Sequence, residues 1–141
     1  MKPRLHNALA AVAGFVAANV VMFSAQLVNE RLYPELMAAV AAGDPARLAA
    51  EAAKPGTSGA LVVVLVAWLA GSAVGGFLAT RLAAGGSRLP ALVLGALLTL
   101  GGVFNNLAFP PPIWFWIATP LALLLPALLA ASLVPRSPSP A

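Results

Sequence analysis

Four long apolar segments constrain the fold of this chain more than any other feature of its sequence. They cover about residues 5–29, 58–83, 89–109 and 112–134, and no Asp, Glu, Lys or Arg lies well inside any of them. A helix needs about 20 apolar residues to cross a bilayer, and it satisfies its own backbone hydrogen bonds in lipid. The sequence therefore predicts an all-α fold. We expect an integral membrane four-helix bundle, a single domain over residues 1–134, followed by a disordered Pro/Ser tail at 135–141.

The low content of charged residues supports a lipid environment. Only 9% of the 141 residues are charged and 61% are hydrophobic, whereas about a quarter of the residues in soluble domains are charged. A soluble chain of this length could not cover its surface with so few charges. The sequence also contains no cysteine, which excludes disulfides, thiolate metal ligands and cysteine nucleophiles.

The first apolar segment has an alternative interpretation as a signal peptide, with Lys2 and Arg4 as its basic start. Cleavage after Ala25 would place Phe23 at a position where a small residue is required. We therefore favour a first membrane span over a cleaved signal.

The distribution of charge predicts the orientation of the bundle. All four acidic residues lie in segment 30–57. The amino-terminal lead, the turn after the second span and the carboxyl-terminal tail carry bases and no acid. Because cytoplasmic segments are enriched in Lys and Arg, we predict that both termini are cytoplasmic and that segment 30–57 lies outside. Bases spread in this way do not form the basic face of a nucleic-acid-binding protein, and we expect no nucleic-acid partner.

Segment 30–57 is the only long polar segment between spans. Pro34 can begin a short helix that ends at Gly43, and Asp44 followed by Pro45 can begin a second. We expect one or two short helices at the membrane interface. The alternative is a loosely ordered, alanine-rich loop.

The second span carries a stripe of small residues on one helical face. The stripe recurs every fourth residue and consists of Ala67, Gly71, Gly75, Ala79 and Ala83. In lipid such a stripe lets another helix approach closely. Small stripes also occur in the other three spans, so we expect the stripe to pack mainly within the chain. A contact between subunits is the alternative.

Polar side chains near the outer ends of the spans give one candidate site. Its residues are Gln26, Glu30, Tyr33, Asn105, Asn106 and Trp114. One interpretation is a pocket for a lipid headgroup or a small polar molecule. The other is hydrogen bonding between helices, which contributes about 0.6 kcal/mol per contact.

The sequence shows no set of residues suited to catalysis. It has no Ser/His/Asp set, no metal-ligand cluster and no phosphate-binding loop. We therefore expect a non-enzymatic membrane protein without a cofactor. It would be a structural or accessory component, either self-associating or part of a larger membrane complex. The alternative is a lipid or small-molecule binder or transporter that uses the outer polar pocket.

Four short motifs, in this order and spacing, resemble a family of small bacterial four-span membrane proteins of unassigned function. They are Leu32-Tyr33-Pro34, Ala79-Thr80-Arg81-Leu82-Ala83, Leu89-Pro90-Ala91-Leu92-Val93 and Pro110-Pro111-Pro112-Ile113-Trp114-Phe115. The resemblance implies a multi-pass protein of the bacterial cytoplasmic (inner) membrane and no particular activity. Family members often carry an acid and a histidine before the Tyr-Pro pair and a histidine in the proline turn. Gln26, Glu30 and Pro111 stand at those places here, which implies that any metal or proton chemistry of the family is absent.

Overall fold

The computed structural model describes residues 3–135, and these residues form helices connected by short turns. In chain order the elements are α1 (Pro3–Leu32), α2 (Pro34–Ala42), α3 (Pro45–Ala52), α4 (Ser58–Arg81), the short 3-10 helix η1 (Ala84–Gly86), α5 (Leu89–Ala108) and α6 (Ile113–Ser132). No strand occurs within residues 3–135. The all-α prediction is confirmed, and α1, α4, α5 and α6 are long and apolar enough to cross a membrane. Of the predicted disordered tail, all but Pro135 lies outside the described residues.

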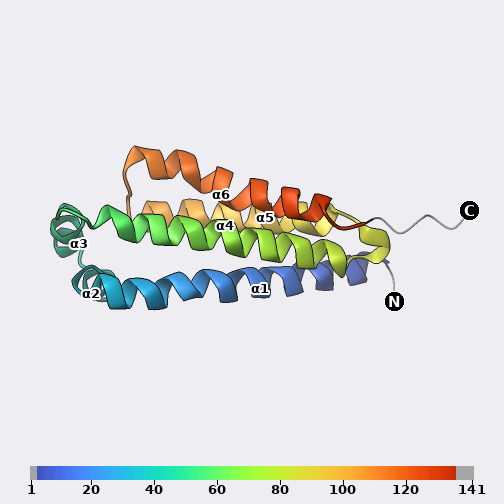
Figure 1. The fold of residues 1–141 in the computed structure, drawn as a ribbon, viewed down its shortest axis with the longest axis horizontal. Helices are drawn as coiled ribbons and strands as arrows, with labels where there is room; N and C mark the ends of the chain where they lie inside the picture. The colour runs from blue at the N-terminus through green and yellow to red at the C-terminus, as the bar shows by residue number, and fades with distance from the viewer. Residues whose placement is uncertain (1–2, 136–141) are drawn as a thin grey trace, which may run out of the picture.

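The four long helices run side by side along one axis (Figure 1). The start of α1, the η1 turn and the end of α6 lie at one end of the bundle, and α2 and α3 lie at the other (Figure 1). Hydrogen bonds join the segments of the first end: Asn7 Oδ1 accepts from Ala84 N at 2.9 Å, and Arg88 donates to Ser132 O at 3.3 Å. We call the opposite end the hairpin end, after the α2–α3 hairpin.

Helices α2 and α3 form where the sequence places their start and stop signals. Pro34 occupies the first turn of α2, and Gly43 ends that helix with a φ of 60° that glycine adopts without strain. Asp44 then accepts hydrogen bonds from Ala46 N and Arg47 N at 3.0 and 3.1 Å, which caps the start of α3. The predicted pair of short helices is therefore present.

Helix α4 is the central element because it has small residues on two faces. Toward α1, a Cβ on Gly75 would lie 2.7 Å from Gly14 O, and a Cβ on Gly71 would lie 2.7 Å from Ala18 O. Toward α6, a Cβ on Gly76 would lie 2.5 Å from the Cα of Ala127. Figure 1 shows α4 between α1 and α6. Glycine at these positions lets three helices approach one another at backbone distance.

All five residues of the predicted small stripe are buried within the chain. They are Ala67, Gly71, Gly75, Ala79 and Ala83. The face of α4 that contacts α6 contains two further small residues, Ser72 and Gly76, which the stripe did not include.

Helix α6 continues through two prolines. Pro126 has no N–H to donate to the carbonyl four residues earlier, which loosens the hydrogen-bond pattern of the helix there. The hydroxyl of Ser72 donates to the neighbouring carbonyl of Leu123. In lipid, side-chain hydroxyls of this kind replace the water that would otherwise solvate a loosened helix. Leu123 also belongs to the buried core, which includes Leu94 and Leu98 of α5.

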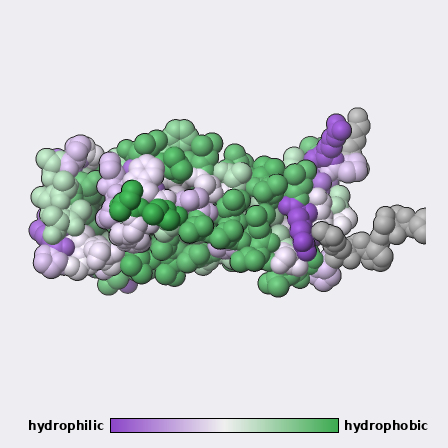
Figure 2. Space-filling model, turned by 90° about the horizontal axis from the view of Figure 1, so that it is seen from above, coloured by the Kyte–Doolittle hydropathy of each residue, from purple (hydrophilic) through white to green (hydrophobic). Residues whose placement is uncertain are grey.

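The side surface of the bundle is apolar. Large side chains on every long helix point outward, with Val20 68%, Phe104 63% and Leu129 66% exposed. Figure 2 shows hydrophobic side chains along most of the length and strongly hydrophilic ones toward the ends. In water this surface would be unstable, whereas in a bilayer the acyl chains cover it.

Candidate polar pocket at the hairpin end

A cavity of about 670 Å³ lies at the hairpin end of the bundle. Its walls come from α1, α4 and the end of α5, and the α2–α3 hairpin contributes to its lining. Helices α1 and α5 pack together deeper in the bundle, where a Cβ on Gly14 would lie 3.1 Å from Leu94 Cδ1. The cavity opens to the surface beside the exposed side chains of Phe23, Glu30 and Asn105.

The cavity extends well into the length of the spans. Along α1 its lining runs from Glu30 back to Asn19, and along α4 from Ser58 to Trp68. At a rise of 1.5 Å per residue these stretches are each about 15 Å long. This is about half of the 30 Å hydrocarbon thickness of a bilayer.

Most polar groups of the lining lie near the hairpin end; the exception is Asn19 at the deep end, whose Nδ2 donates to Phe15 O at 2.8 Å. Gln26 Nε2 donates to Glu30 Oε1 at 3.2 Å. Asn29 is 3% exposed, and its Nδ2 donates to Ala60 O at 3.2 Å. The Oδ1 atom of the same amide is buried and has no hydrogen-bond partner in the part of the chain that the structure describes. Within residues 3–135, no Lys, Arg or His lines the cavity, and Glu30 is the one charged side chain in the lining.

Apart from Asn19, the deeper lining is apolar. It includes Met22 of α1 and Leu61, Val64 and Trp68 of α4. Trp68 packs against Phe115 of α6, with ring centroids 5.4 Å apart, so the tryptophan ring has a fixed neighbour behind it. A molecule with a polar head and an apolar tail would match this order of surfaces.

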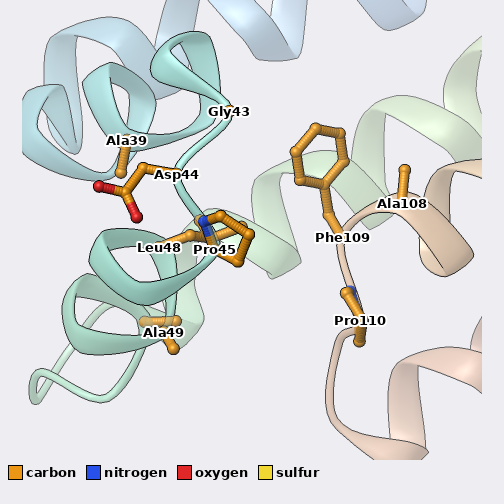
Figure 3. A pocket seen from close by; sticks show the side chains of 10 residues that line it. Ala39, Gly43, Asp44, Pro45, Leu48, Ala49, Ala108, Phe109 and Pro110 are labelled. Atoms are coloured by element: carbon orange, nitrogen blue, oxygen red, sulfur yellow. The ribbon is translucent and has the colours of Figure 1, made fainter.

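A second cleft of about 440 Å³ lies between the hairpin and the end of α5. Figure 3 shows Phe109 and Pro110 across an open space from Leu48 and Pro45. Leu48 and Phe109 line both spaces. The hairpin therefore does not pack tightly against the end of α5 and the turn that follows it.

Within the hairpin, ion pairs connect its own residues. Arg47 contacts Glu35 at 3.0 Å and Lys54 contacts Glu51 at 2.6 Å. Both basic side chains are solvent-exposed, and exposed pairs of this kind contribute little to stability.

Three of the six predicted site residues line the cavity, and three do not. Gln26, Glu30 and Asn105 line it. Tyr33 instead places its hydroxyl against Gly59, where a Cβ would collide with it. Trp114 packs edge-on against Phe115 with a centroid distance of 5.4 Å.

Asn106 points away from the cavity and into the interface between α5 and α6. It is fully buried, and its Nδ2 donates to Thr119 Oγ1 at 2.8 Å. Thr119 Oγ1 donates in turn to Phe115 O at 2.8 Å. Successive residues on a helix are about 100° apart, and here that rotation takes Asn106 out of the cavity lining that contains Asn105. Asn105 faces the cavity, and Asn106 joins two helices.

Sequence reasoning did not select Asn29 or Trp68 as site residues. Asn29 follows Gln26 by three residues, a spacing that places both on neighbouring parts of one helical face. That spacing was a usable signal. Trp68 is interpreted more readily as a packing residue, and its position at the deep end of the cavity follows only from the tertiary structure.

Among residues 3–135, no group of three or more His, Cys, Asp or Glu side chains could hold a metal ion. Comparison of the chain with known protein families, with curated proteins and with solved structures finds no match. The resemblance to a four-span bacterial family therefore stays a prediction.

Proposed function

We propose that this chain is a non-enzymatic, multi-pass membrane protein that binds an amphiphilic molecule in the cavity at the hairpin end. The observation that carries the proposal is the order of surfaces in one cavity. Polar groups at Gln26, Asn29 and Glu30 lie near the hairpin, and apolar groups around Trp68 lie deeper. A volume of about 670 Å³ is within the range of about 300–1,000 Å³ that small-molecule sites occupy.

The proposal includes a location and an orientation. We place the protein in the bacterial cytoplasmic membrane, with both termini in the cytoplasm. The charge distribution supports this orientation, because all four acids lie in the segment that contains the α2–α3 hairpin. The cavity would then lie in the outer half of the bilayer.

We favour ligand binding over a structural or accessory role because the sequence feature that suggested association is accounted for within the chain. The small-residue stripe that favoured association with another helix is buried within this chain. Gly71 and Gly75 contact α1, and Gly76 contacts α6. The stripe is therefore explained without a second subunit.

The experiment fills part of the cavity by enlarging a side chain in its wall. Val64 lines the cavity and is half-buried, whereas Val66 on the same helix is 58% exposed on the lipid-facing surface. Val64→Trp is the test variant, and Val66→Trp is the matched control. Each protein is extracted into a neutral detergent, and native mass spectrometry counts the lipids that remain bound.

We expect the wild type and Val66→Trp to retain a lipid that Val64→Trp loses. Circular dichroism verifies that the variants are folded, and Val64→Phe replaces Val64→Trp if the larger ring prevents folding. Equal retention by all the folded variants would overturn the proposal.

A further inference from the structure

We propose that the head of the bound amphiphile carries a primary ammonium group and that anionic heads are rejected. This inference rests on the proposed function, because it names the ligand class of the same cavity. It follows from the juxtaposition of a buried acceptor without a partner and a carboxylate, in a lining that contains no basic residue.

The first acceptor is Asn29 Oδ1. Ala60 O accepts from the nitrogen of this amide, so the oxygen must point elsewhere. That oxygen is buried and has no partner among the described residues. A buried acceptor without a donor costs about 1–3 kcal/mol, and a ligand that supplies an N–H or O–H would remove that cost.

The second acceptor is the carboxylate of Glu30, the next residue along α1. Gln26 Nε2 donates to one of its oxygens, which fixes the side chain on the cavity side of the helix. The lining thus contains a negative charge and, on the preceding residue, an acceptor without a partner. A primary ammonium has three N–H donors and no acceptor, so it can pair with the carboxylate and still donate to a second acceptor.

The basic residues of the hairpin do not reverse this charge balance. Arg47 is paired with Glu35 and Lys54 with Glu51, and neither base lines the cavity. Arg31, the residue after Glu30, is exposed and does not line the cavity either, so a phosphate or carboxylate head in the cavity would lie beside Glu30 with no base in the described lining. Such an arrangement of like charges discriminates against the anionic ligand.

The apolar lining fixes the direction of the ligand. Met22, Val64 and Trp68 continue the cavity away from Glu30 toward the middle of the spans. An ammonium at Asn29 and Glu30 therefore places its alkyl tail against Trp68. Trp68 is the natural reporter for binding.

The test uses the quenching of tryptophan fluorescence by a bromine on the tail of the ligand. The chain has three tryptophans, and the double variant Trp114→Phe and Trp116→Phe leaves Trp68 as the sole emitter. The full-length protein is placed in phosphatidylcholine nanodiscs. It is titrated with terminally brominated undecyl chains that carry a primary ammonium, a trimethylammonium, a hydroxyl or a carboxylate.

We expect saturable quenching by the primary ammonium with at least tenfold higher affinity than by the carboxylate. The trimethylammonium keeps the charge but has no N–H, and we expect it to bind about fivefold more weakly than the primary ammonium. Glu30→Gln keeps an acceptor and removes the charge, so ammonium affinity should fall about fivefold while hydroxyl affinity stays within twofold. Glu35→Gln removes an acid of α2 outside the cavity lining and should change neither affinity more than twofold.

The experiment distinguishes failure of the ammonium inference from failure of the proposed function. Equal or tighter binding of the carboxylate, or equal effects of Glu30→Gln and Glu35→Gln, would overturn the ammonium inference and leave the cavity as a binding site. The absence of saturable quenching by all four chains would overturn the proposed function as well.

Discussion

Replacing Gly76 by alanine tests the close approach of α4 and α6 directly. A Cβ at this position would lie 2.5 Å from Ala127 Cα and 2.7 Å from the carbonyl carbon of the same residue. Ordinary van der Waals contact between carbons begins near 3.5 Å, so α6 must move by about 1 Å. The obstacle is backbone, which no change of side-chain rotamer can relieve.

The expected change in the free energy of unfolding is the difference between two opposing contributions. Forcing extra volume into a packed interface costs about 1–3 kcal/mol. Replacing a helical glycine by alanine returns about 0.5–1 kcal/mol. We therefore expect Gly76→Ala to lower the free energy of unfolding by about 1–2 kcal/mol.

Gly101 supplies the matched control for this experiment. It lies within helix α5, and a Cβ added there would meet no atom within 4 Å. Gly101→Ala should therefore keep the helix-propensity gain and leave the protein as stable as the wild type or more stable.

The assay is reversible unfolding in mixed micelles with increasing dodecyl sulfate, followed by tryptophan fluorescence. If Gly76→Ala were as stable as Gly101→Ala, the backbone contact between α4 and α6 would be refuted. A loss of stability in both variants by the same amount would point to a general effect of glycine replacement, and it too would refute the argument.

Three further predictions concern the interior and the orientation. Ser72→Ala removes the hydrogen bond to Leu123 O, and the same unfolding assay should show a loss of about 1 kcal/mol. Asn106→Leu removes a hydrogen bond to α6 together with a buried oxygen that has no partner, so its stability should stay within about 0.5 kcal/mol of the wild type. The sequence contains no cysteine, so single cysteines can report sidedness: Lys54→Cys should react with an impermeant maleimide in intact cells, and Ser87→Cys should react only after the membrane is opened. Reversed labelling would contradict the proposed orientation.

The helices could be predicted because their signals are local. The length of each apolar segment, the prolines at helix starts and the glycine after α2 act within a few residues. The first span was predicted at 5–29, whereas α1 extends over Pro3–Leu32. Its last turn is polar, and hydrophobicity alone cannot detect a helix that continues beyond the lipid.

The arrangement of the helices was harder to predict. A stripe at a period of four indicates one close neighbour, and Gly71 and Gly75 fit that pattern. Gly76 belongs to a second face, and its role depends on where α6 lies. The residues around Gly76 do not indicate which helix will pack against it.

The candidate site was predicted in part for a similar reason. Gln26 and Glu30 are four residues apart, so one helical face holds both. Asn105 and Asn106 are adjacent, and only the rotation of α5 about its axis decides which of them faces the cavity. The unpartnered oxygen of Asn29 is a property of the tertiary structure, because it depends on Ala60 accepting from the nitrogen of that amide.

The packing of α1 against α4 has a consequence for synthesis of the chain. Gly14 and Ala18 of α1 contact Gly71 and Gly75 of α4, and the hairpin segment separates the two helices in sequence. At about 5–20 residues per second, the ribosome completes Arg81 roughly 2–10 s after Leu32. During that interval α1 is in the membrane with its glycine face uncovered. This makes the nascent first span, rather than the finished bundle, the species most exposed to wrong helix partners and to membrane proteases.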